Sequence, residues 1–214
     1  MIFESKVILW STLSIVAVAY VVLLVKFLIE RRAYKQWMRS LNKDALLRDE
    51  AELKKCLKEA GIQSRDSSIE ELIQGQSYKI RETPFLFFRE AYTSVKPCKE
   101  VVVRKRLSAE RRHFALFHEL MHIIYTPEEL LLEQRNRGIH HIFIRRDDEE
   151  QKRDYLAASL ILPEDEIWKR LEECSYFKLS KNDQKRIVYS IASDYSIEPS
   201  AVIRRICELQ VIHN

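Results

Sequence analysis

Residues 111–127 read RRHFALFHELMHIIYTP and place two histidines four positions apart, with a glutamate directly after the first. On a helix, positions i and i+4 share one face with Cβ atoms roughly 6 Å apart, so His118 and His122 can share a metal ion. Glu119 lies about 100° further round the helix, where it can accept a proton from a water beside that ion. The spacing is what hydrolytic zinc chemistry requires, because zinc accepts imidazole nitrogens and a catalytic site keeps one position open.

The surrounding residues predict that this motif lies on a helix. Ser108 is a suitable N-cap, and Thr126-Pro127 provides a stop, for a largely apolar segment between them. A pattern with three fixed positions also arises by chance, but not usually inside such a segment. Burying two histidines and a glutamate there without partners costs a free energy on the order of several kcal/mol, and a metal ion supplies the partner.

A third protein ligand is needed, and the acidic segment DDEEQKRDYLAASLILPED at 147–165 offers several. Glu150 and Asp154 are four positions apart and face one side of a predicted helix. Glu150 can complete a His-His-Glu set, while Asp154 can accept a hydrogen bond from the second nitrogen of a ligand histidine. Other acids near this N-terminus are alternatives, because the helix dipole alone favours acids there. These alternatives are Asp147, Asp148 and Glu149.

The remaining periodicity predicts an α+β fold in which helices dominate. Three short runs rich in β-branched and aromatic residues, SYKIRE, PFLFFREAY and KEVVVRKR, predict a small antiparallel sheet between residues 77 and 106. Helical spacing predicts helices at 44–60, 67–74, 108–125, 127–136, 147–161, 164–173, 181–194 and 199–210, with a short extended piece at 138–144.

The N-terminal region suggests a membrane anchor. The nineteen residues from 7 to 25 contain no charged side chain, and a helix of that length covers most of a hydrocarbon core. The excess of basic residues after this run predicts that the C-terminal side is cytoplasmic, so we expect a single-pass membrane protein. The basic residues are Lys26, Arg31, Arg32, Lys35, Arg39 and Lys43.

Cysteine spacing and charge exclude some classes of protein. The four cysteines are far apart and form no CxxC pair, which argues against a disulfide framework and a cysteine zinc site. The net charge of +4 is modest, and we expect no direct nucleic-acid partner. A helix-turn-helix reader remains an alternative, because residues 192–202 have suitable spacing and Arg204 and Arg205 follow them.

Two segments together resemble the ImmA/IrrE family of zinc metallopeptidases. RKRLSAERRHFALFHELMHIIY at 104–125 has the family's arginine-rich lead-in to HExxH, and EEQKRDYLAASLILPED at 149–165 is similar to its second motif, ExxANxFAAxLLMP. IASDYSIEPSAVIRRICELQVI at 191–212 is similar to the family's closing helix pair. This chain departs from the family at Met121, where glycine is usual, and at Arg153, where alanine is usual, which puts the shape of the substrate pocket in question.

The resemblance implies a zincin-like metallo-endopeptidase. It implies that His118, His122 and Glu150 are the zinc ligands, that Glu119 is the general base, and that the substrate is a protein, such as a cytoplasmic helix-turn-helix repressor or another regulator. A silent zinc-bearing sensor with the same fold is an alternative. The donor that stabilises the oxyanion is not assigned, with His140, His141 and Tyr155 as candidates.

These expectations divide the chain into three parts. A transmembrane anchor with its basic flank occupies 1–32, a helical juxtamembrane or linker region occupies 33–74, and the metallopeptidase domain occupies 75–214.

Overall fold

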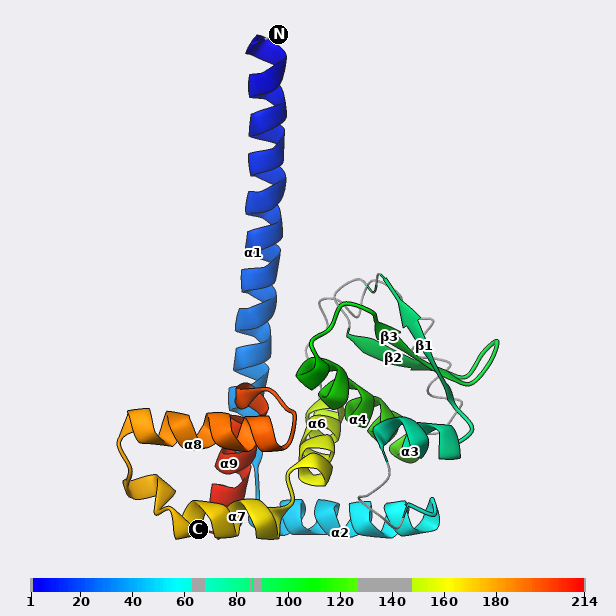
Figure 1. Ribbon diagram of the computed structural model, residues 1–214, viewed down its shortest axis with the longest axis vertical. Helices are drawn as coiled ribbons and strands as arrows, with labels where there is room; N and C mark the ends of the chain where they lie inside the picture. The colour runs from blue at the N-terminus through cyan, green and yellow to red at the C-terminus, as the bar shows by residue number, and fades with distance from the viewer. Residues whose placement is uncertain (1, 63–67, 85, 87–89, 127–147, 214) are drawn as a thin grey trace.

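The structure is a computed structural model that describes residues 2–62, 68–84, 86, 90–126 and 148–213. Its elements, in chain order, are α1 (Ile2–Ser40), α2 (Lys43–Glu59), α3 (Ile69–Gly75), β1 (Lys79–Thr83), β2 (Ala91–Ser94), β3 (Glu100–Arg104), α4 (Ala109–Tyr125), α6 (Asp148–Ile161), α7 (Glu164–Glu173), η2 (Tyr176–Lys178), α8 (Lys181–Asp194) and α9 (Pro199–His213). The helix predicted at 127–136 and the extended piece predicted at 138–144 lie outside the described residues. The predicted α+β fold, mostly helical with one small sheet, is confirmed (Figure 1).

The sheet is mixed, so the expectation of an antiparallel sheet is wrong for one of its two pairings. Its order is β1-β3-β2, with β2 antiparallel to β3 and β1 parallel to β3. The central strand β3 carries the buried residues Val101, Val102 and Val103. The sequence marks where strands break, near Pro84 and Pro97, but strand order depends on packing. β1 lies on the edge opposite to β2, and it runs in the same direction as β3.

Two neighbouring helices form the centre of the molecule. The Ser108 hydroxyl caps α4 by accepting a hydrogen bond from the Arg111 amide at 3.3 Å, as the sequence predicts. α4 packs beside α6, with one face of α4 covered by the sheet (Figure 1). Leu116 and Leu120 of α4 and Leu156 of α6 are fully buried in the core between them. This packing fixes how the side chains of the two helices face each other.

Residues on both sides of the predicted boundary at residue 75 share one core. Trp37 of α1 and Leu46 and Leu53 of α2 are buried in the same cluster as Leu116 and Tyr155. α2 packs against α6 and α9. The three-part division of the chain stays a prediction, but residues from the 33–74 segment contribute directly to the core around α6.

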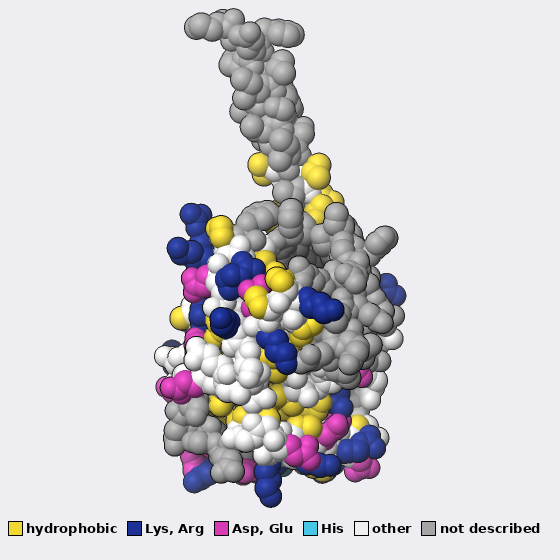
Figure 2. All heavy atoms as spheres, turned by 90° about the vertical axis from the view of Figure 1, so that its right-hand side faces the viewer, with side chains coloured by type: hydrophobic (Ala, Val, Ile, Leu, Met, Phe, Trp, Pro, Cys, Tyr) yellow, Lys and Arg dark blue, Asp and Glu magenta, His cyan; other side chains and the backbone are white. Residues whose placement is uncertain are grey.

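The long helix α1 does not support the predicted membrane anchor. In the part of the chain that the structure describes, no helix has the length and apolar character needed to cross a membrane. The apolar run continues without a break into a helical segment that contains Lys26, Glu30 and Arg31, so charged positions belong to the same element. The predicted single-pass membrane location, with a cytoplasmic C-terminal side, is therefore wrong. Exposed hydrophobic side chains do occur where the helix leaves the body of the molecule (Figure 2).

Candidate metal centre

The two histidines of the motif face each other on successive turns of α4. The Nε2 atoms of His118 and His122 are 3.1 Å apart, and the rings meet edge to face with their centroids 4.9 Å apart. Both side chains are largely buried, with 12% and 10% of their surfaces exposed. The helical spacing therefore brings two ring nitrogens to one point, as the sequence predicts.

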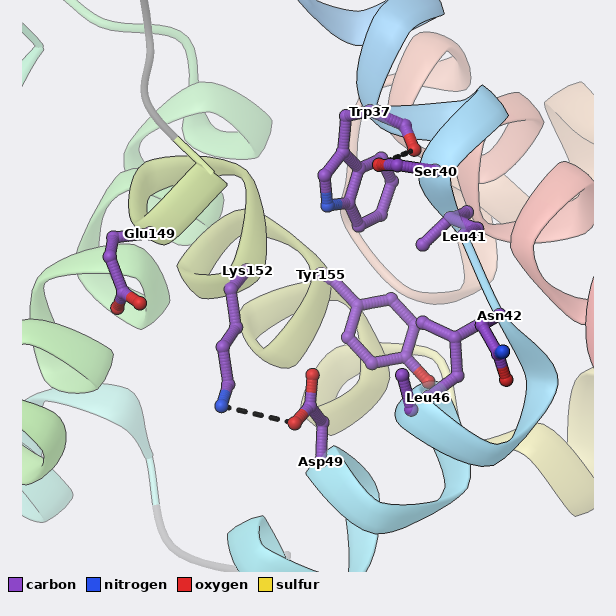
Figure 3. Close-up of a pocket in the computed structure, with 10 residues that line it drawn as sticks. Trp37, Ser40, Leu41, Asn42, Leu46, Asp49, Glu149, Lys152 and Tyr155 are labelled. Carbon is purple, nitrogen blue, oxygen red and sulfur yellow. Dashed lines mark hydrogen bonds and ion pairs between the residues drawn. The ribbon is translucent and has the colours of Figure 1, made fainter.

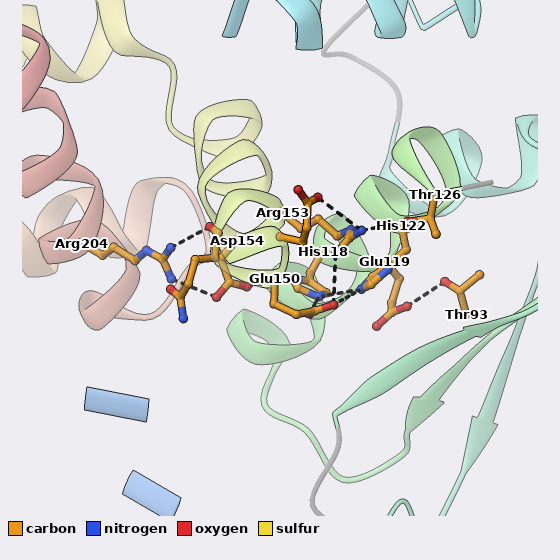
Figure 4. A network of polar contacts seen from close by, with 11 residues as sticks. Thr93, His118, Glu119, His122, Thr126, Glu150, Arg153, Asp154 and Arg204 are labelled. Carbon is orange, nitrogen blue, oxygen red and sulfur yellow. Dashed lines mark hydrogen bonds and ion pairs between the residues drawn. The ribbon is translucent and has the colours of Figure 1, made fainter. Parts of the chain in front are cut away.

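Glu150 of α6 completes this arrangement from the neighbouring helix (Figure 4). Its Oε2 lies 3.3 Å from His118 Nε2, and its Oε1 lies 3.5 Å from His122 Nε2. Ligand atoms of a tetrahedral zinc site with bonds of about 2.0–2.1 Å are separated by about 3.3–3.4 Å. The separations between the two nitrogens and the carboxylate oxygens therefore match what one such ion requires.

Asp154 has the supporting position rather than the ligand position. Its Oδ1 accepts a hydrogen bond from His118 Nδ1 at 2.8 Å, and its side chain is 1% exposed. Because an ionised carboxylate only accepts, Nδ1 carries a proton, and Nε2 is the ring nitrogen directed at the site. The expectation that Asp154 accepts a hydrogen bond from a histidine is confirmed. Of the rival acids, Glu149 is 70% exposed, and Asp147 and the Asp148 side chain lie outside what is described.

The electrostatics of the cluster favour a positive charge at its centre. Burial lowers the pKa of His118, but the carboxylates of Asp154 and Glu150 outweigh this effect and raise the pKa to about 10. Burial raises the pKa of Glu150, but hydrogen bonding to His118 and His122 outweighs it and moves the pKa well below its ordinary value. In addition, the buried His122 Nδ1 has no hydrogen-bond partner among the described residues. A cation among these groups fits their chemistry.

Glu119 approaches the same point from α4. One ligand atom from each of His118, Glu119 and His122 lies within 4.8 Å of the others, a group able to hold a divalent metal ion. Its carboxylate is held from the sheet, because Thr93 of β2 donates a hydrogen bond from Oγ1 to Glu119 Oε2 at 2.7 Å. The site therefore brings two carboxylates to the two Nε2 atoms, Glu119 from α4 and Glu150 from α6.

Sequence reasoning missed two residues that hold these carboxylates. Thr93 carries no motif, since β-branched residues are common in strands for reasons of packing alone. Arg153, one of the departures from the family pattern, donates from Nη1 to Glu150 Oε1 at 3.2 Å and from Nη2 to Thr126 Oγ1 at 3.2 Å (Figure 4). Its charge and its position three residues after Glu150 were the only signals of this role.

Other predicted functional residues lie elsewhere. The Tyr155 hydroxyl donates to Glu50 of α2, so it is not the oxyanion donor, and His140 and His141 lie outside the described residues. The phosphate contacts of a helix-turn-helix reader find no support, because Arg205 is fully buried and Arg204 donates to Asp154 at 2.9 Å.

The fold and this cluster agree with the comparison against known families. A family model described as Peptidase_M78, IrrE N-terminal-like domain, matches residues 74–206, which is more than half of the chain and includes both site helices. A search of curated proteins gives no significant match. The HExxH group on α4 and the matched region together account for the earlier resemblance. The chain belongs to the M78 metallopeptidase family with an IrrE N-terminal-like domain.

Proposed function

We propose that this protein is a zinc metallo-endopeptidase in which His118, His122 and Glu150 bind the ion and Glu119 is the general base. The observation that carries the proposal is the convergence of two Nε2 atoms, 3.1 Å apart, with a carboxylate 3.3 and 3.5 Å away. Three such donors at one largely buried point are unfavourable without positive charge among them, and a divalent metal ion that binds all three supplies it.

The residues of this chain divide the chemistry between them. A bound zinc ion supplies Lewis acidity, which acidifies water and polarises a peptide carbonyl. Glu119 accepts the proton of the attacking water and then donates it to the leaving amine. Thr93 holds Glu119 Oε2, which fixes the direction of the carboxylate. Asp154 keeps the His118 ring in the orientation that presents Nε2.

We propose that the substrate is a regulatory protein, such as a helix-turn-helix repressor. Membership of the M78 family supports a protein substrate, and the earlier resemblance supports a regulator. The alternative, a zinc-bearing sensor without turnover, keeps the same metal site and differs only in Glu119, which has no chemical task in a sensor.

The test is Glu119→Gln in the full chain. Glutamine keeps the shape of the side chain but cannot take a proton, so we expect zinc content to stay at the wild-type level and peptide cleavage to fall by about 10²–10⁴-fold. Zinc content is measured by mass spectrometry of the metal, and cleavage with a library of peptides derived from cellular proteins. Glu149→Gln is the matched control, since Glu149 is 70% exposed, and should match wild type in both.

Two results would contradict the proposal in different ways. Cleavage that survives Glu119→Gln removes Glu119 as the base. A wild-type chain that holds zinc stoichiometrically but cleaves no peptide of the library favours the sensor.

A further inference from the structure

A line of buried contacts leads from the metal centre to the end of α1. His118 Nδ1 donates to Asp154 Oδ1 at 2.8 Å, and Asp154 Oδ2 accepts from Arg204 Nη1 of α9 at 2.9 Å. Arg204 is held on its other edges, because Nη2 donates to the Gln151 carbonyl at 3.1 Å and Nε donates to Glu208 Oε1 at 2.9 Å. The orientation of one metal ligand therefore depends on where this guanidinium lies.

The face of the same guanidinium is covered by two aromatic rings of α1. Arg204 Cζ lies 4.8 Å from the centroid of the Trp37 ring and 5.2 Å from that of Tyr34. Rings at these distances attract a guanidinium and restrict its orientation, most strongly where water is excluded. Trp37 is 7% exposed, so water is largely excluded here. Both rings lie outside the region 74–206 that the family model matches, so the family pattern does not include this contact.

The Trp37 ring is not held by close packing on every side. It borders a pocket of about 210 Å³ between the α1–α2 junction and α6 (Figure 3). Tyr155 also lines this pocket, and its ring centroid lies 6.2 Å from that of Trp37. Lys152 and Asp49, which line the pocket as well, form an ion pair of 3.0 Å. On its other sides the indole contacts Arg204, Tyr34 and Tyr155 within the hydrophobic core.

We propose that Tyr34 and Trp37 are positioning residues for the metal centre: they hold Arg204, which holds Asp154, which orients the imidazole of His118. This inference rests on the metal site proposed above. It makes the end of α1 part of the functional unit, although no atom of α1 belongs to the metal cluster itself. Metal affinity therefore depends on the rings of Tyr34 and Trp37, which belong to α1 and not to the motif helix α4. Their effect passes through Arg204.

A double-mutant cycle in the full chain tests this route. Zinc affinity is measured by competition with a chromophoric chelator, and the ligand geometry by the visible absorbance of the cobalt-substituted site. Trp37→Leu should weaken zinc binding about tenfold and change the cobalt spectrum, since outer partners of metal ligands have effects of about 10–100-fold. In the Arg204→Gln background the same change should have less than about a twofold effect, because the link is already broken.

Conservative and matched variants separate positioning from packing. Trp37→Phe keeps a ring over the guanidinium and should bind zinc within about threefold of wild type. Trp168→Leu removes a partly buried tryptophan of α7 that contacts His213 and not Arg204, and it should leave zinc affinity unchanged. If Trp37→Leu does not fold, Tyr34→Leu takes its place in the cycle with the same expectations.

The outcomes point to different failures. If Trp37→Leu weakens binding equally in both backgrounds, or not at all, the inference is overturned while the metal site stands. If the wild-type chain binds no zinc, the proposed function and this inference fall together.

Discussion

Two buried polar clusters lie on different faces of α6, and they are built in opposite ways. In the first, the metal cluster of His118, His122 and Glu150, electron-pair donors converge on one point. In the second, the ion network around Arg205, the guanidinium donates to oxygen atoms that surround it. Arg205 Nη2 donates to Glu50 Oε1 at 2.9 Å, and Arg205 Nε donates to the Leu162 carbonyl at 3.1 Å.

The difference separates structural from functional burial of charge. A network whose charges are complementary holds helices together without an added ion. The ion network does this, since Glu50 comes from α2, Arg205 from α9 and Tyr155 from α6. A cluster of converging lone pairs needs positive charge at its centre, from a proton or a metal ion, which is why the metal cluster indicates a binding site. Removing one member should therefore have different consequences in the two clusters.

The largest expected effect is on stability, in the ion network. Arg205→Met leaves the buried carboxylate of Glu50 without its cation, whereas Glu208 keeps its 2.9 Å pair with Arg204, and removing one partner of a buried pair costs about 3–5 kcal/mol. We expect a loss of that size in the free energy of unfolding, measured by urea denaturation with and without zinc. Arg186→Met is the control, because its pair with Asp183 is exposed and should contribute less than about 1 kcal/mol. A stability of Arg205→Met within the range of the control would break the comparison.

The metal cluster should instead respond to added ion. Zinc at about 100 times its dissociation constant should stabilise the folded chain by about 2.7 kcal/mol, because only the folded state gathers the ligands. For a chain of this size that corresponds to a rise in Tm of about 5–10 °C, measured against a chelator-treated sample. Glu150→Gln should abolish most of the rise, and Glu149→Gln should retain it. An equal rise in Glu150→Gln would show that zinc acts elsewhere.

The local part of this site could be predicted from the sequence. The HExxH spacing sets His118 and His122 on one face through helix geometry alone, and the Ser108 cap and the end near Thr126 follow from local chemistry. Spacing alone could not choose between Glu150 and Asp154, which share a helix face. The choice depends on how α4 and α6 are positioned along each other, and that is a property of the tertiary structure.

The long-range part could not be predicted. Thr93 meets Glu119 because the sheet covers α4, and Arg204 meets Asp154 because α9 packs on α6. No local pattern encodes either pairing. The parallel edge strand was missed for the same reason. The membrane expectation rested on the uncharged run 7–25 alone, and among the described residues no helix is long and apolar enough to span a membrane.

The smallest expected effect compares the loss of one hydroxyl donor in each cluster. The donors are Thr93 beside Glu119 and Ser159 beside Glu50. Thr93→Val removes the hydroxyl that donates to Glu119 Oε2 at 2.7 Å, and a hydrogen bond to a charged group contributes about 1.5–3 kcal/mol. We expect kcat to fall about tenfold with zinc content unchanged, and Thr93→Ser, which keeps the hydroxyl, to stay within about twofold of the wild-type kcat.

Ser159→Ala is the control in the ion network, since it removes a 3.3 Å contact to Glu50. Glu50 also accepts from Tyr155 and Arg205, so this variant should change the free energy of unfolding by less than about 1 kcal/mol and leave kcat unaltered. Equal kcat in Thr93→Val and Thr93→Ser would mean that Glu119 is oriented by other contacts, and the sheet would then have no part in the chemistry beyond covering α4.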